Sequence, residues 1–302
     1  MNILIEILVL IFLPPLLPGL INRTKALIAG RKGPPVLQLY YDLAKLQRKK
    51  MVLSSTTSWI FFAGPVVTVA ACFLAALFVP QGNLPAPVSF TGDVILFAYL
   101  LGLARFFTAA AALDTGSAFE GMGAAREVTF ACLAEPALFF GLLVMARLSG
   151  ELSLSPMLAN PWSFGWSPGA AAALALVAAG WFVVLLVENC RVPFDDPNTH
   201  LELTMIHEVM VLDHSGPALG LILYGASLKF FVLGALLLRL LVPFSSGNAI
   251  GDIMIFLGSM TALAILTGIV ESMMARLRLV AVPKILVAVT LVSAFALVLL
   301  VR

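Results

Sequence analysis

The residues from Glu188 to Glu208, ENCRVPFDDPNTHLELTMIHE, gather side chains that could move protons, bind a metal ion or pair with a charged partner. The chain around this stretch is mostly Leu, Ala, Val and Phe, so the concentration of ionisable groups is local. Histidine titrates near neutral pH, and carboxylates change their proton affinity with their surroundings. The ionisable residues of the stretch are Glu188, Arg191, Asp195, Asp196, His200, Glu202, His207 and Glu208.

The spacing of these residues argues against a metal site. A zinc-protease motif needs a second histidine four residues after the first, and Val211 stands at that distance from His207. His200 and His207 are two helical turns apart, which favours hydrogen-bonded or solvated rings. The three cysteines lie far apart in the sequence and form no metal-binding pair. The chain also has no nucleophile–base pair and no phosphate-binding loop, so we predict no catalytic, metal-binding or cofactor-binding residue and a scaffold rather than a stand-alone enzyme.

The composition predicts that a membrane surrounds this stretch. Of the 302 residues 61% are hydrophobic and 11% are charged, whereas soluble domains carry roughly 25% charged residues. The mean hydropathy is +1.05. The net charge of +2, without a large basic patch, argues against a nucleic-acid partner. We predict an all-α polytopic membrane protein, a single transmembrane domain over residues 1–302. Its eight spans are expected at about 3–21, 58–79, 93–113, 128–148, 170–188, 217–242, 250–270 and 280–301.

The connections between the predicted spans alternate in charge. Those after spans two, four and six are neutral and rich in Pro, Gly and Ser, and that side holds Arg147, Arg239 and Arg302. Lys and Arg are enriched in cytoplasmic connections. The opposite side should therefore face the cytoplasm, with both termini outside and residues 189–216 as a cytoplasmic loop. The thirteen basic residues on that side are Arg23, Lys25, Arg31, Lys32, Lys45, Arg48, Lys49, Lys50, Arg126, Arg191, Arg276, Arg278 and Lys284.

Two of the cytoplasmic connections should contain amphipathic helices. In VLQLYYDLAKLQRKK, after span one, the apolar residues recur at helical intervals among polar and basic ones, which is typical of a helix at the membrane interface. In the loop after span five, Asp196-Pro197 resembles a helix start, and a capping-box pattern ends at Glu202. This second helix would pack partly on the membrane domain and partly on a docked subunit.

Several charges fall inside or at the ends of the predicted spans. Such charges are costly in a bilayer and either serve an ion path or pair with one another. Carboxylates at similar depths favour a buried polar path, while a passive anchor with structural ion pairs is the alternative. The residues are Arg105, Asp114, Glu135, Glu188, Lys229 and Glu271.

Three ordered groups of residues resemble the complex I subunit 1 family. They are the pattern E-x-x-R-x-P-F-D at Glu188 to Asp195 with Glu202-Leu203, the sequence RKGP at 31–34 followed by Asp42 and Lys45, and Gly123-Ala124 with Arg126 and Glu135. The matches span essentially the whole chain. Within the family, LDTGS at 113–117, LDHSG at 212–216, Lys229, and Asn198 and His200 in the loop resemble the membrane subunits of [NiFe] hydrogenases and formate hydrogenlyases.

This resemblance implies a membrane subunit that anchors a soluble arm and couples its electron transfer to proton or sodium translocation. The implied partners are an iron–sulfur small subunit and a [NiFe] large subunit, which would carry the [4Fe-4S] clusters and the [NiFe] centre, and antiporter-like membrane subunits. The implied location is the inner membrane of a prokaryote. The implied coupling surface comprises Arg31, Lys32, Asp42, Lys45, Arg126, Arg191, Asp195, Asp196, His200, Glu202, His207, Glu208 and Asp213. A quinone-site subunit of an NADH:quinone oxidoreductase and a secondary ion transporter are the alternative functions.

Overall fold

The computed structural model describes residues 2–159, 168–196, 205–242 and 244–301. All regular elements in these ranges are helices. Seven are long and apolar enough to cross a membrane, and a bent helix pair raises the number to eight, which confirms the predicted fold class. The helices are α1 (Asn2–Phe12), α2 (Leu16–Ile28), α3 (Gln38–Gln47), α4 (Trp59–Ala76), α5 (Asp93–Asp114), α6 (Ala118–Ser149), α7 (Leu154–Ala159), α8 (Pro168–Glu188), α9 (His207–Met210), α10 (Gly216–Leu241), α11 (Ala249–Met273) and α12 (Ala281–Val301).

The first span is broken where the sequence has consecutive prolines. Helices α1 and α2 meet at 48° across Pro14 and Pro15. Because Pro15 has no N–H, the Ile11 carbonyl loses its helical donor. The Tyr224 hydroxyl of α10 donates to that carbonyl at 3.2 Å, and the Tyr40 hydroxyl of α3 donates to the Phe12 carbonyl. Two tyrosine hydroxyls thus supply hydrogen bonds to backbone carbonyls that lipid could not hydrogen-bond.

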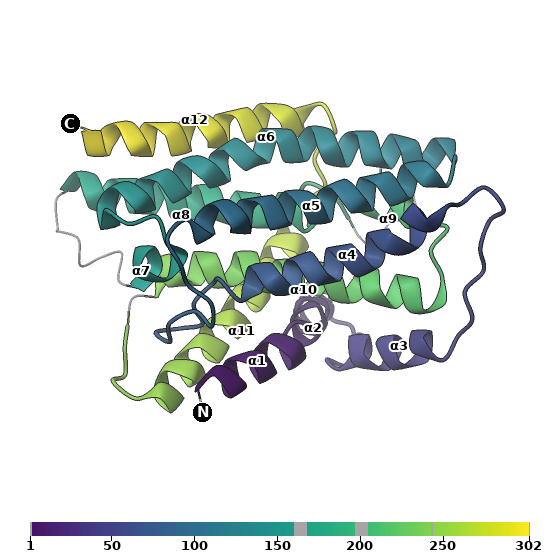
Figure 1. Ribbon diagram of the computed structural model, residues 1–302, viewed down its shortest axis with the longest axis horizontal. Helices are drawn as coiled ribbons and strands as arrows, with labels where there is room; N and C mark the ends of the chain where they lie inside the picture. The colour runs from purple at the N-terminus through teal and green to yellow at the C-terminus, as the bar shows by residue number, and fades with distance from the viewer. Residues whose placement is uncertain (1, 160–167, 197–204, 243, 302) are drawn as a thin grey trace.

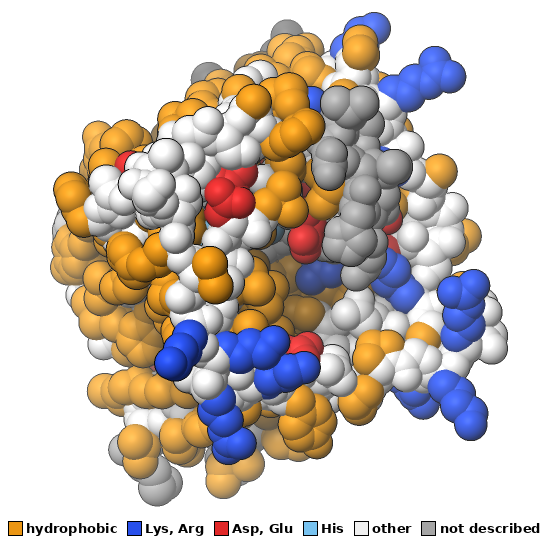
Figure 2. Space-filling model, turned by 90° about the vertical axis from the view of Figure 1, so that its right-hand side faces the viewer, with side chains coloured by type: hydrophobic (Ala, Val, Ile, Leu, Met, Phe, Trp, Pro, Cys, Tyr) orange, Lys and Arg blue, Asp and Glu red, His pale blue; other side chains and the backbone are white. Residues whose placement is uncertain are grey.

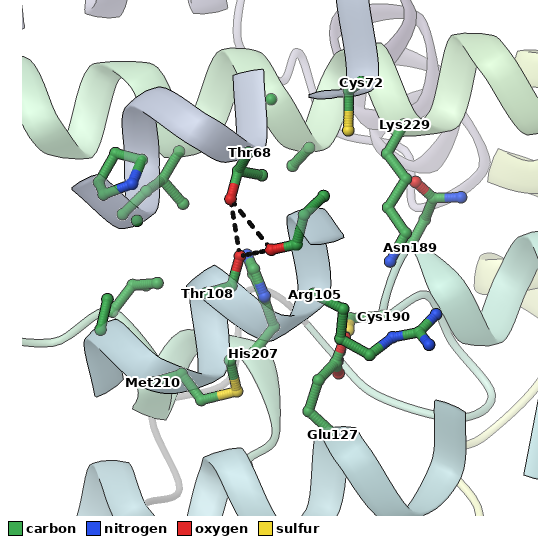
Figure 3. Close-up of a pocket in the computed structure, with 18 of the residues that line it drawn as sticks. Thr68, Cys72, Arg105, Thr108, Glu127, Asn189, Cys190, His207, Met210 and Lys229 are labelled. Atoms are coloured by element: carbon green, nitrogen blue, oxygen red, sulfur yellow. Dashed lines mark hydrogen bonds between the residues drawn. The ribbon is translucent and has the colours of Figure 1, made fainter. Parts of the chain in front are cut away.

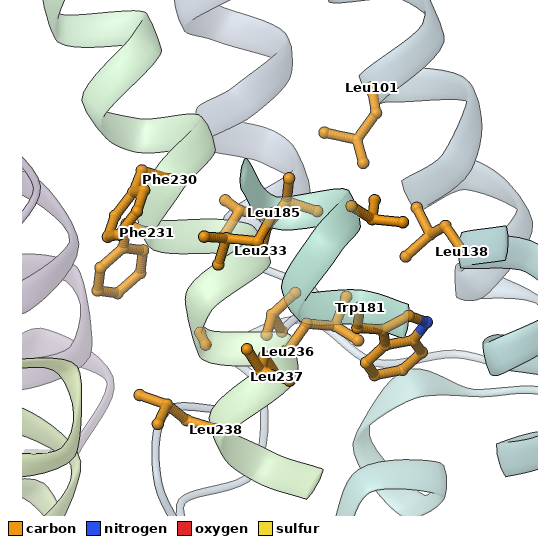
Figure 4. Close-up of a cluster of buried hydrophobic side chains, with 14 of the residues drawn as sticks. Leu101, Leu138, Trp181, Leu185, Phe230, Phe231, Leu233, Leu236, Leu237 and Leu238 are labelled. Atoms are coloured by element: carbon orange, nitrogen blue, oxygen red, sulfur yellow. The ribbon is translucent and has the colours of Figure 1, made fainter. Parts of the chain in front are cut away.

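Helix α10 forms the centre of the bundle. It packs against α4, α8, α11 and the surface helix α3. In Figure 4, Leu236 of α10 lies toward Trp181 and Leu185 of α8, whereas Phe230 and Phe231 lie on the opposite side of α10, and all five side chains are buried. This part of α10 carries apolar side chains on all sides, as expected for a helix surrounded by other helices.

Helix α6 is longer than the span that hydropathy predicts. It begins at Ala118 instead of residue 128, because its first turns carry Glu120, Arg126 and Glu127, which a search for apolar runs excludes. As a result, Glu135 lies near the middle of α6, whereas hydropathy predicted it at the start of a span.

The charged connections gather at one end of the molecule. The segments 29–58, 115–117, 189–196, 205–215 and 274–280 lie next to helix ends toward the right of Figure 1. Figure 2 shows this face, with Lys and Arg side chains around a hollow that contains acidic side chains. The alternation of charge along the sequence therefore corresponds to one common face, called the charged face below.

Surface helix α3 lies on this face, and its Leu43 and Leu46 approach Gly220 of α10. The predicted amphipathic helix after span one is therefore confirmed. Most of the predicted helix after span five lies outside the described residues, and the described part of that loop contains the four-residue α9.

Candidate functional site

Four charged side chains from four helices meet inside the bundle. Arg105 of α5 contacts Glu135 of α6 through Nη1, and its Nη2 donates to both carboxylate oxygens of Glu188 of α8 at 2.8 Å. Lys229 Nζ of α10 lies 2.7 Å from Glu188 Oε2. We call these residues the four-charge cluster. The structure thus brings together four of the six residues predicted within the spans.

The cluster contains as many cations as carboxylates, so it is neutral when all four groups are charged. Glu188 is deeply buried, with a side chain 6% exposed, and it has two cationic partners. Glu135 has one cationic partner and a side chain that is 35% exposed. Charge-assisted hydrogen bonds offset the loss of hydration, and removing one member leaves an uncompensated charge. The cluster can therefore hold or release a proton only in step with a change of charge nearby.

A cavity of about 70 Å³ extends along the cluster. Arg105, Glu188 and Lys229 line it, together with residues of α4, of the turn after α8 and of the segment around α9. Thr68 of α4 and Thr108 of α5 share a hydrogen bond of 2.9 Å inside it (Figure 3). The cavity thus joins buried charges to groups that can donate and accept protons.

The segment 205–215, called the roof segment, covers the cavity and is tied down through its backbone. The buried Asp195 carboxylate accepts hydrogen bonds from the Ile206 and His207 N–H groups at 3.1 and 3.2 Å. Arg126 donates to the Met205 carbonyl at 2.9 Å, and Glu120 accepts from the Asp213 N–H at 3.0 Å. Side chains of α6 and of the preceding loop therefore set the position of the roof segment.

Further ion pairs connect this region to α2 and α11. Glu271, at the end of α11, has a fully buried side chain and lies 2.7 Å from Lys25 and 3.4 Å from Arg191. Asp195 pairs with Arg276 at 2.7 Å. The Leu277 N–H also donates to the Pro193 carbonyl at 2.8 Å. The connection between α11 and α12 is thus bonded to the loop that follows Glu188.

The other predicted site residues lie apart from the four-charge cluster. Asp114 accepts hydrogen bonds from the Ser58 backbone and hydroxyl at 2.6 and 2.7 Å, so it holds the start of α4. Asp42 accepts from Gln38 within α3. Arg31, Lys32 and Lys45 are exposed on the charged face. His200 and Glu202 lie outside the described residues, and Asp196 and Glu208 stand before and after that undescribed range. His207 lines the cavity.

Several residues of the site were missed by sequence reasoning. Glu120, Glu127 and Arg276 fall near predicted span ends, where charges are ordinary, and Lys25 was counted only toward the positive charge of its connection. Asp195, predicted as part of the coupling surface, is buried and pairs with Arg276, because the loop folds toward α11 and α12. Glu127 and His214 line the cavity. The motif LDHSG was the one signal that pointed to His214.

The described residues offer no metal centre, since no group of three or more His, Cys, Asp and Glu side chains is arranged around a common point. Burial raises the pKa of the Cys190 thiol well above its usual value, and the nearby Glu127 and Asp195 carboxylates raise it further. The thiol therefore stays protonated at neutral pH and is a poor metal ligand or nucleophile.

Comparison with known proteins places the chain in a family. The model of the NADH dehydrogenase family matches residues 1–302. Hydrogenase-4 component C of Escherichia coli is 32% identical over 90% of this chain and 87% of its own length. Formate hydrogenlyase subunit 4 of the same organism is 32% identical over 93% of this chain and 92% of its own length.

More distant relatives share the fold. A subunit of the NADH-quinone oxidoreductase of Burkholderia vietnamiensis is 24% identical over 68% of this chain and 60% of its own length. A chain in the structure of the archaeal membrane-bound sulfane sulfur reductase superposes with a TM-score of 0.83 over 98% of both chains, at 22% identity. The family match over the full sequence, with these relatives, shows that the chain belongs to the NADH dehydrogenase family that includes subunit 1 of complex I.

Proposed function

We propose that this chain is the membrane subunit of a membrane-bound [NiFe] hydrogenase complex of the hydrogenase-4 or formate hydrogenlyase type. It anchors a soluble arm and couples the electron transfer in that arm to the movement of protons or sodium ions. The similarity to two hydrogenase-system components over about nine-tenths of the chain supports this assignment. The observation that carries the coupling role is the four-charge cluster beside a cavity roofed by the charged face.

The coupling role follows from electrostatics in a low-dielectric site. A change of charge or position at the roof segment changes the field at the cavity, and buried carboxylates respond by binding or releasing protons. The roof segment and the turn after Glu188 are bonded to each other through Asp195. A soluble subunit that displaces this loop would therefore act on both ends of the cavity.

The partners proposed for the charged face are the iron–sulfur small subunit and the [NiFe] large subunit. Those subunits would carry the [4Fe-4S] clusters and the [NiFe] centre, and antiporter-like membrane subunits would continue the ion path. Exposed Arg31, Lys32 and Lys45 supply positive charge on the docking side. The residues Asp195, Arg126 and Glu120 act indirectly, because they hold the roof segment in place.

Purification of the complex in mild detergent tests the assignment. We expect the tagged chain to copurify with a [NiFe] large subunit, an iron–sulfur protein and at least one antiporter-like membrane protein. Copurification with an NADH-oxidising flavoprotein would support the quinone-linked alternative instead. A chain that purifies alone, from cells in which the hydrogenase is active, would count against the proposal.

The proposed location is the inner membrane, with the charged face in the cytoplasm and both termini outside. Single cysteines at Ser54, on the charged face, and at Ser245, on the opposite side, can test this in a chain whose native cysteines are replaced. Both serines are exposed. A membrane-impermeant thiol reagent should label Ser54→Cys only in inverted vesicles and Ser245→Cys only in intact cells with a permeable outer layer. The reverse pattern would overturn the orientation.

A further inference from the structure

His214 of the roof segment has an environment that the proposed function leaves unexplained. Its ring is 5% exposed and stacks on Phe61 of α4, with ring centroids 4.0 Å apart and an angle of 18° between the planes. Neither ring nitrogen makes a hydrogen bond of normal geometry in the described part of the chain. The residue also lines the cavity that reaches Lys229 and Glu188.

A buried imidazole whose nitrogens make no hydrogen bond of normal geometry is costly, because the loss of water is then poorly compensated. Stacking on Phe61 holds the ring in place without supplying such a hydrogen bond. Burial lowers the pKa of His214, and the Phe61 backbone and the Asp213 carboxylate partly offset that effect. At neutral pH the ring is therefore mostly uncharged, with one nitrogen able to accept a proton and the other able to donate one.

The cavity runs from His214 to the four-charge cluster along two helices. Ile222, Gly225 and Lys229 line it at helical intervals on α10, which begins two residues after His214. The distance along α10 from its start to Lys229 is about 20 Å. On α4, the residue stacked on His214 and Thr68 are seven residues apart, or about 10 Å. By these helical rises, the hydroxyl pair of Thr68 and Thr108 lies between His214 and the cluster. Figure 3 shows the two hydroxyls facing each other in the cavity.

The charged and titratable groups around this route come from every element that packs on it. Helix α4 supplies the thiol of Cys72, α5 supplies Arg105, and α10 supplies Lys229. Helix α6 supplies Glu127, and its Glu120 binds the Asp213 backbone. The turn after α8 supplies Cys190 beside Glu188, and the roof segment itself supplies His207. Asp213 of the roof segment does not line the cavity, but its charge acts on His214. Histidine is the side-chain type that ordinarily titrates near neutral pH, and His214 is a buried histidine of this cavity.

We propose that His214 carries protons between the cytoplasmic side and the four-charge cluster. A proton from the cytoplasmic side binds one ring nitrogen, and the proton on the other nitrogen leaves toward the hydroxyl pair and the cluster. Loss of that second proton leaves the neutral ring as the opposite tautomer, and exchange of tautomers restores the starting form, so protons balance and no electron moves. This inference rests on the proposed function and names the group through which protons reach the buried carboxylates.

The test uses inverted membrane vesicles that contain the whole complex. His214→Asn keeps a side chain that can hydrogen-bond but removes titration near neutral pH. Proton uptake, driven by the donor that supports hydrogen evolution in unaltered vesicles, should slow by about 100-fold, within the range that proton-transfer groups contribute in enzymes. Hydrogen evolution by the soluble arm with an artificial donor should stay unchanged. Cys132→Ala, which alters an exposed residue that does not line the cavity, should leave proton uptake near its unaltered rate.

Chemical rescue separates proton transfer from a structural role. His214→Ala should also slow proton uptake, and added imidazole should restore much of the rate, because it can occupy the space beside Phe61. Analysis of the subunits that copurify shows whether each variant assembles. If His214→Asn does not assemble, the rescue of His214→Ala and the pH profile of the unaltered complex decide. That profile should show uptake falling as the pH rises above the lowered pKa of His214.

Normal proton uptake in an assembled His214→Asn complex would overturn the inference. So would slow uptake in His214→Ala that imidazole does not restore, or an unaltered complex that takes up sodium ions and no protons. Glu135→Gln and Glu188→Gln remove the two carboxylates of the cluster. If these variants slow uptake while His214→Asn does not, the inference fails and the proposed function stands. If none of these variants changes uptake, the proposed function itself fails.

Discussion

Glu188→Gln should slow ion uptake by inverted vesicles about 100-fold while the soluble arm keeps its hydrogenase activity with an artificial electron donor. Glutamine preserves the size and much of the hydrogen bonding of the side chain but removes its titration. Glu188 has two cationic partners, Arg105 and Lys229, so its proton affinity depends on both. Turnover with the physiological donor should also fall where the two processes are tightly coupled. The measurement is the rate of ion uptake beside the rate of hydrogen evolution.

A passive anchor makes a different prediction for the same site. If Glu188 only neutralises its partners, Glu188→Gln leaves a buried excess of positive charge, at about 3–5 kcal/mol, and assembly suffers. The double variant Glu188→Gln with Lys229→Gln restores neutrality. As an anchor it should assemble and take up ions normally, whereas in a proton path it should assemble without ion uptake.

Glu135→Gln provides the second comparison, because Glu135 has one cationic partner and greater exposure. It should assemble more readily than Glu188→Gln and still lose ion uptake. Normal ion uptake per hydrogen evolved in Glu135→Gln, Glu188→Gln and the double variant would rule out the proton path.

Asp195→Ala should strip the soluble arm from the membrane subunit without preventing membrane insertion. The Asp195 carboxylate is 1% exposed, accepts the Ile206 and His207 N–H groups and pairs with Arg276. Its removal leaves the Arg276 cation and the Ile206 and His207 N–H groups without this acceptor, which costs several kcal/mol. The loop then loses its fixed position, and the yield of copurified soluble subunits should fall by about 100-fold, the factor that roughly 3 kcal/mol represents.

Two further variants give this prediction its controls. Asp195→Asn keeps an acceptor for the backbone but loses the charge, so it should give an intermediate yield. Glu151→Ala removes an exposed carboxylate from the opposite side and should leave the yield unchanged. Full yield and full coupling in Asp195→Ala would show that the contacts of Asp195 do not organise the docking face.

The sequence predicted the membrane helices well, because burial in lipid requires long apolar runs that hydropathy detects. It also singled out Arg105, Glu135, Glu188 and Lys229, since charge among apolar residues is rare. Which of these groups pair depends on how the helices rotate and pack, and no single sequence gives that. Asp114, for example, resembles the others in position, but it caps α4 through Ser58.

The missed residues show a second limit. Glu120 and Glu127 stand where a helix is expected to leave the membrane, and charges there need no explanation from sequence alone. Only the length of α6 reveals that they are inside the folded protein, against the roof segment and the cavity. His214 was similarly hidden, because one histidine in a loop is ordinary until its neighbours are known.

The broken first span has a mechanical consequence. The hydroxyls of Tyr40 and Tyr224 fasten the surface helix α3 and the central helix α10 to the same joint between α1 and α2. Tyr224 precedes Lys229 by five residues, about 7.5 Å along α10. If α10 slid along its axis, the hydrogen bond from Tyr224 to the Ile11 carbonyl would break, and lipid could not replace it. Helix α10 is therefore expected to keep its position during turnover. Coupling through this subunit should then depend on movements of side chains and charge rather than on sliding helices.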